Sequence, residues 1–143
     1  MKSLGAFLGY KSSITIKNII LGVHDISYVG IYSVSGDVYI KDSTIDSYKT
    51  EGFGSEGDSL YVISCDDGNA YLDNVSYTSL NSYTDIYAYG DINIKDSNFD
   101  IDGSGYLTWC SYLDIKESDI TFDDTDYILY AYYDINIDHV NIT

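Results

Sequence analysis

The acidic side chains are the residues of this sequence with the clearest potential for chemistry. Two pairs of adjacent carboxylates, Asp66-Asp67 and Asp123-Asp124, have the residue type that serves in general acid–base catalysis. The two histidines stand near opposite ends of the chain, and no nucleophile, base and orienting group can be assembled around either pair. Asp is also a common turn residue, because its side chain bonds its own backbone. We therefore expect turns rather than a catalytic site, no enzyme activity and no cofactor.

One acidic segment resembles a metal-binding loop. The residues from Asn98 to Gly103 read like the start of a calcium loop, whose twelfth position should be Glu. That position is Trp109, so the match fails at the residue that would hold the ion on two oxygens. No metal site is predicted, and weak Ca²⁺ binding among the acidic turn residues is left open.

Cys65 and Cys110 fall in nearly the same column of the repeat described next, two coils apart. Two coils correspond to ~10 Å between the Cα atoms, whereas a disulfide needs them within ~7 Å. The sequence predicts two free, half-buried thiols, which mildly favours a reducing compartment.

A repeat of about 22 residues organises the chain. Six segments share an apolar–polar–apolar start, and their second apolar residues are separated by 24, 32, 22, 21 and 22 positions. The alternation around each of these anchors indicates a strand with one face inward. The six anchors are Ile16, Ile40, Leu72, Ile94, Ile115 and Ile137.

A second strand is predicted before each later anchor, as in the segment from Gly30 to Val34. A coil this short cannot bury its own apolar face, so the coils must stack to form one core. Parallel connections are nearly always right-handed. We expect an all-β, single-domain, right-handed parallel β-helix (a β-solenoid) of about six coils over 1–143, with a lead-in or cap at 1–13 and an inserted loop at 47–59.

The segment from Val38 to Ile45 resembles the coil repeat of right-handed parallel β-helix proteins, the pectate-lyase-like superfamily. The resemblance covers roughly Ile14 to Ile142 and implies architecture but not function. Enzymes of that superfamily use an Arg base with Ca²⁺-binding carboxylates, or clustered Asp residues with a Gly-His-Gly segment. This chain has no Arg and no such segment, so the resemblance does not imply catalysis.

The net charge of −16 is the strongest functional indication. Four of the seven lysines (Lys17, Lys41, Lys95 and Lys116) follow the anchors in one column beside acidic residues, which leaves the rest of the surface almost purely acidic. Spread over a six-coil rod of ~29 Å, the charge amounts to one per ~1.8 Å, against one per ~1.7 Å in duplex DNA. The predicted binding residues are Asp66, Asp67, Asp100, Asp102, Asp123, Asp124 and Asp126 on the acidic surface, and Glu51, Phe53, Glu56 and Asp58 in the inserted loop.

These features favour a non-catalytic protein that binds a basic macromolecular partner, such as a nucleic-acid-binding protein, as DNA-mimic inhibitors of phage or mobile elements do. Direct nucleic-acid binding and membrane insertion are not expected. The alternative is a coil segment of an extracellular adhesin, surface fibre or tail-spike protein. Because no secretory signal is recognisable, the first hypothesis implies a cytoplasmic protein and the alternative a fragment of an exported chain. An acidic surface that only maintains solubility, a loop without a binding role, and end-to-end self-association through exposed strand edges also remain open.

Overall fold

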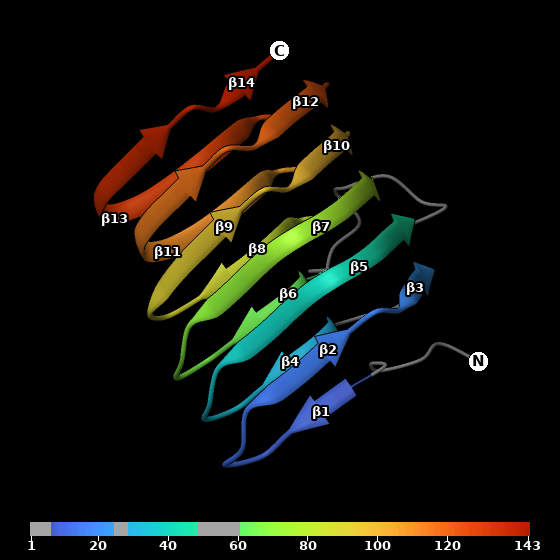
Figure 1. The fold of residues 1–143 in the computed structure, drawn as a ribbon, viewed down its shortest axis with the longest axis vertical. Helices are drawn as coiled ribbons and strands as arrows, with labels where there is room; N and C mark the ends of the chain where they lie inside the picture. The colour runs from blue at the N-terminus through green and yellow to red at the C-terminus, as the bar shows by residue number, and fades with distance from the viewer. Residues whose placement is uncertain (1–6, 25–28, 49–60) are drawn as a thin grey trace.

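The computed structural model describes residues 7–24, 29–48 and 61–143, which form strands and no helix. The strands stack into a parallel β-solenoid of about five turns, slightly fewer than the six expected, with coils about 22 residues apart (Figure 1). The strands are β1 (Phe7–Gly9), β2 (Ile14–Lys17), β3 (Ile20–His24), β4 (Val29–Ser33), β5 (Val38–Tyr48), β6 (Tyr61–Cys65), β7 (Ala70–Leu80), β8 (Thr84–Ala88), β9 (Asp91–Lys95), β10 (Asn98–Asp102), β11 (Tyr106–Lys116), β12 (Asp119–Asp123), β13 (Tyr127–Asp138) and β14 (Asn141–Ile142).

Each coil has three sides, and every strand pairs in parallel with its equivalent in the next coil. Side A contains β1, β4, β6, β8 and the first halves of β11 and β13. Side B contains β2, the first halves of β5 and β7, then β9 and the second halves of β11 and β13. Side C contains β3, the second halves of β5 and β7, then β10, β12 and β14.

The strand register confirms the predicted repeat. The six anchors are consecutive Cα partners along side B, from Ile16 beside Ile40 at one end to Ile115 beside Ile137 at the other. The predicted second strands form side A, where the inward column includes Ile31, Ile63 and Ile86. Register is specified this strongly because a slip of one residue would turn every apolar side chain outward.

The corner between sides B and C is made by one residue per coil in the left-handed backbone region. Asn, Asp and His tolerate this conformation better than most residues, since their short polar side chains bond locally. The residue that follows is often a serine that fixes the corner: the Ser97 hydroxyl donates to the Lys95 carbonyl at 2.7 Å and accepts the Val75 N–H at 3.1 Å. The corner residues are Asn18, Asp42, Asn74, Asp96, Glu117 and His139, with φ between 49° and 56°.

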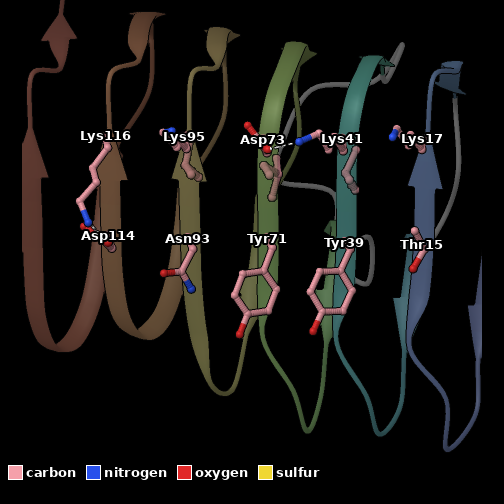
Figure 2. A pocket seen from close by; sticks show the side chains of 13 residues that line it. Thr15, Lys17, Tyr39, Lys41, Tyr71, Asp73, Asn93, Lys95, Asp114 and Lys116 are labelled. Carbon is pink, nitrogen blue, oxygen red and sulfur yellow. Dashed lines mark hydrogen bonds and ion pairs between the residues drawn. The ribbon is translucent and has the colours of Figure 1, made fainter.

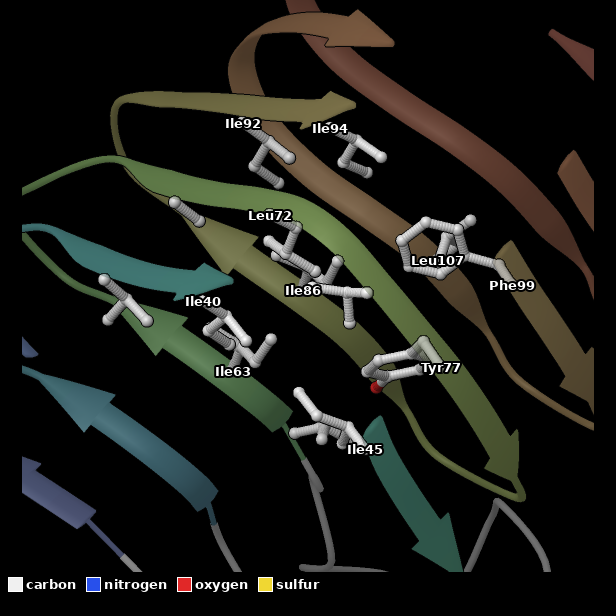
Figure 3. Packing of buried hydrophobic residues seen from close by; sticks show 14 of the residues in the cluster. Ile40, Ile45, Ile63, Leu72, Tyr77, Ile86, Ile92, Ile94, Phe99 and Leu107 are labelled. Carbon is white, nitrogen blue, oxygen red and sulfur yellow. The ribbon is translucent and has the colours of Figure 1, made fainter. Parts of the chain in front are cut away.

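The core is a continuous stack of inward side chains from all three sides (Figure 3). Ile40, Leu72 and Ile94 of side B face Ile63 and Ile86 of side A, and each is at most 2% exposed. Side C adds two buried aromatic rings, Tyr77 and Phe99, whose centroids lie 5.4 Å apart. Burial of this apolar surface is the main driving force that holds the coils together, because a single coil has no second layer to pack against.

Two predicted boundaries fall partly outside the described residues. The lead-in at 1–13 contains β1, which pairs with β4 of the next coil. Of the expected insertion at 47–59, Ser47 and Tyr48 belong to β5, and the remaining residues lie outside the described part of the chain. No helix in the described part of the chain has the length and apolar character needed to cross a membrane.

Candidate functional site

The outward face of side C carries a concentration of carboxylates. Along a strand, every second side chain points outward, so Asp100 and Asp102 of β10 share this face with Asp119 and Asp123 of β12. Asp46 lies two coils away in the same column as Asp100. We call the following set the acidic patch: Asp46, Asp100, Asp102, Asp119 and Asp123, together with two aspartates of the turn that follows β12, Asp124 and Asp126.

The geometry of the acidic patch places like charges side by side. Asp102 and Asp123 are direct Cα partners across the β10–β12 ladder, where like charges destabilise a sheet. Outward residues along one strand are ~7 Å apart and neighbouring coils ~4.8 Å apart, so the patch is a two-dimensional array of carboxylates. Three aspartates of the patch (Asp46, Asp100 and Asp102) line a shallow depression of about 390 Å³ together with His24 and other residues.

Within the described residues, the carboxylates of the acidic patch have few cationic partners. Side C carries no lysine within the described residues. The single ion pair that the described residues make to the patch joins His24 Nε2 and Asp46 Oδ2 at 3.1 Å, and its histidine is charged only when protonated. Among the described residues, this face therefore carries mostly unpaired negative charge.

The structure separates the predicted acidic residues into two groups. All seven are exposed, but only Asp100, Asp102, Asp123, Asp124 and Asp126 belong to the acidic patch. The remaining two, Asp66 and Asp67, lie in the turn between sides A and B, where the Tyr32 hydroxyl donates to the first of them. The four residues predicted in the inserted loop (Glu51, Phe53, Glu56 and Asp58) lie outside the described residues.

Two members of the patch were missed by the sequence prediction. Asp46 stands six residues after the anchor Ile40, as Asp100 stands six residues after Ile94. Asp119 is the register partner of Asn98 in β10. Both could have been found by extending the repeat alignment beyond the anchor strand. The same extension would have separated the Asp66-Asp67 pair from the aspartates of side C.

Side B carries four of the seven lysines, and several of its charges are paired within the side. A shallow groove of about 550 Å³ runs along this face. Figure 2 shows the two outward columns of side chains that line it. Lys41 Nζ lies 2.7 Å from Asp73 Oδ2, and Lys116 Nζ lies 2.7 Å from Asp114 Oδ2. The predicted column of four lysines is confirmed by the strand register, but Lys41 and Lys116 pair with carboxylates of side B and not with the corner residues that follow them.

Several outward tyrosines stack on a tyrosine of the neighbouring coil. The rings of Tyr39 and Tyr71 on side B are 4.8 Å apart and nearly parallel, with an interplanar angle of 5° (Figure 2). On side A the ring of Tyr106 stacks on Tyr127 of the next coil, with the ring centroids 5.1 Å apart and an interplanar angle of 11°. These contacts bury aromatic surface along the solenoid axis and stabilise the stack.

The two cysteines are free and buried. Burial raises the pKa of the thiols of Cys65 and Cys110 to about 12. Both point inward, where the first donates weakly to the Asn69 carbonyl at 3.5 Å. Because the thiolate is the reactive form, neither group is suited to nucleophilic chemistry.

Asp85 is a fully buried carboxylate at the start of side A in its coil. Its Oδ1 accepts hydrogen bonds from the Tyr77 hydroxyl at 3.0 Å and the Ser82 hydroxyl at 2.5 Å. Its Oδ2 is buried without a hydrogen-bond partner among the described residues. Burial raises the pKa of this carboxyl to about 6, although hydrogen bonds from Ser79, Ser82, Tyr77 and Ser104 oppose the shift. A carboxyl enclosed in the core cannot reach a substrate, so we assign it a structural role.

No group of three or more His, Cys, Asp or Glu side chains within the described ranges is arranged to hold a metal ion.

Comparison with protein-family models, with curated proteins and with solved structures found no match to this chain. The strand pairing itself therefore establishes the parallel β-solenoid, and the function must be argued from the surface.

Proposed function

We propose that this protein binds a basic macromolecular surface through the acidic patch and blocks it, as a nucleic-acid mimic would. The supporting observation is the array of exposed carboxylates on side C that lacks lysine partners among the described residues. The proposed partner is a DNA- or RNA-binding protein, because its binding groove offers the complementary array of cations.

The distribution of charge supports this proposal more than the total charge does. On side B, Lys41 and Lys116 are held by neighbouring carboxylates, whereas Asp102 and Asp123 of the patch are direct Cα partners and have no ion-pair partner among the described residues. Such a like-charge pair costs stability, and proteins accept that cost most often where function requires it. Complementary charge across an interface mainly raises the association rate and selects the partner.

The direct test is binding of the whole chain to a panel of nucleic-acid-binding proteins in a salt series, with duplex DNA as competitor. We expect at least one partner to bind at low salt, to be displaced by DNA and to be lost steeply as salt rises. Absence of binding at low salt would refute the proposal and leave the alternative, a coil segment of an adhesin, surface fibre or tail-spike protein.

A pair of matched variants tests whether the acidic patch is the binding surface. Asp100→Asn with Asp102→Asn removes two charges from the patch, and Asp66→Asn with Asp67→Asn removes two charges from the turn between sides A and B. We expect the first double variant to bind roughly tenfold or more weakly and the second to bind as the unmodified protein does. Equal losses would show that only net charge matters and would contradict the assignment to side C.

A further inference from the structure

The last coil of the solenoid leaves its inward apolar side chains uncovered. Ile135 and Ile137 of β13 are 45% and 44% exposed, whereas the equivalent residue one coil earlier, Ile115, is fully buried. Within the described residues β13 pairs with β11 alone and β14 with β12 alone, so each has an unpaired strand edge. An exposed strand edge with apolar side chains is a template for another strand.

Within the described residues, the first coil also has an unpaired strand edge. Among the described strands β1 pairs only with β4, and β2 and β3 pair only with β5. Phe7 occupies the inward column of side A and is 39% exposed, and its neighbour Leu8 is 71% exposed. Ile16 is already buried in the single chain, so the apolar surface that this edge offers comes mainly from side A.

The two ends carry opposite charge. Residues 124–143 contain four aspartates and no lysine, whereas residues 7–24 contain two lysines and no carboxylate. In the column formed by the residue that directly follows each anchor, the first coil carries Lys17 and the last coil carries Asp138. Opposite charges in one column are already paired between coils inside the solenoid, where Lys41 binds Asp73.

We propose that the last coil binds the first coil of a second copy, head to tail and in the parallel register that joins coils within the chain. This register continues each inward column without a break and places Asp138 beside Lys17 of the second copy. The pairs, with the second copy's residue named last, are Leu129 with Phe7, Tyr130 with Leu8, Ile135 with Ile14, Ile137 with Ile16, and Ile142 with Leu21. This inference does not depend on the acidic patch or on its partner.

Charge selects this arrangement over the symmetric one. Joining two copies through their last coils would place four aspartates against four aspartates, a juxtaposition that disfavours the pairing. A head-to-tail contact uses two different surfaces, so each bound copy presents a new free end and the contact does not close. The expected product is therefore a linear series of species and not a single dimer.

Sedimentation velocity over a concentration series of the full chain is the primary measurement. We expect the average mass to rise with concentration through dimer, trimer and larger species. Two variants each disable one end: Leu8→Asp changes the first coil, and Ile137→Asp changes the last. Both positions are exposed in the single chain, and circular dichroism verifies that the variants fold.

Each variant alone is expected to remain monomeric, and an equimolar mixture is expected to stop at a dimer, because one intact first coil and one intact last coil remain. Tyr89→Asp is the matched control: this tyrosine is 68% exposed but lies in a middle coil, so assembly should be unchanged. A wild-type monomer at all concentrations would overturn the proposal. Dimerisation of Leu8→Asp alone would also overturn it, in favour of contact between two last coils.

Discussion

The buried carboxyl of Asp85 makes the stability of this protein depend on pH in an unusual direction. Burial is the largest cause of its raised pKa, which moves from 3.8 to about 6. The folded state therefore holds the proton more tightly than the unfolded state does. The contribution of Asp85 to the free energy of unfolding is fully present below about pH 4, and it is lost as the pH rises through about 6. The shift of about two units corresponds to about 3 kcal/mol at neutral pH.

Asp85→Asn tests this reasoning, because Asn imitates the protonated acid and cannot ionise. Its amide oxygen can still accept the hydrogen bonds that Tyr77 and Ser82 donate to Oδ1. We expect the variant and the wild type to have similar free energies of unfolding near pH 4. At pH 7.5 the variant should be more stable by about 2–3 kcal/mol.

Urea unfolding of both proteins between pH 3.5 and 8 measures the difference directly. Repulsion among the remaining carboxylates changes with pH in both proteins and largely cancels in the difference. Asp67→Asn, at an exposed turn position, is the control for loss of one negative charge and should show a small difference at every pH. A difference for Asp85→Asn that does not change with pH, or a variant less stable at pH 7.5, would refute the reasoning.

Three further predictions concern the interior of the solenoid. Leu72→Ala should lower the free energy of unfolding by ~3 kcal/mol in urea titrations, because it leaves a cavity in the centre of the core. Gly68→Ala should destabilise by ~1–3 kcal/mol in the same assay, since its Cβ would lie 2.3 Å from the Gly36 carbonyl oxygen; unchanged stability would show that the two turns can separate. The thiols of Cys65 and Cys110 should react with a disulfide reagent at pH 8 roughly 1,000-fold more slowly in the folded protein than in guanidinium, as followed by absorbance; rapid reaction would contradict their burial.

The repeat was predictable because its signal is carried by single positions. An inward residue such as Ile94 must be apolar in every coil, so the period appears directly in the sequence. The column of lysines was predictable for the same reason: Lys95 holds a fixed offset from its anchor. The burial of Asp85 was not predictable, since an Asp beside Ser and Thr residues has the composition of an ordinary turn.

The acidic surface shows the limit of sequence reasoning in this protein. The sequence by itself determined that the coils stack in parallel, that four of the seven lysines share one column and that acidic residues greatly outnumber basic ones, because these properties follow from composition and period. Only the tertiary structure decided which carboxylates are neighbours. Asp66 and Asp100 look alike in the sequence, but they lie in a turn and on a strand face of different sides. The positions at which each coil bends set these sides, and the bends depend on backbone conformation and packing between coils, which no single residue type specifies.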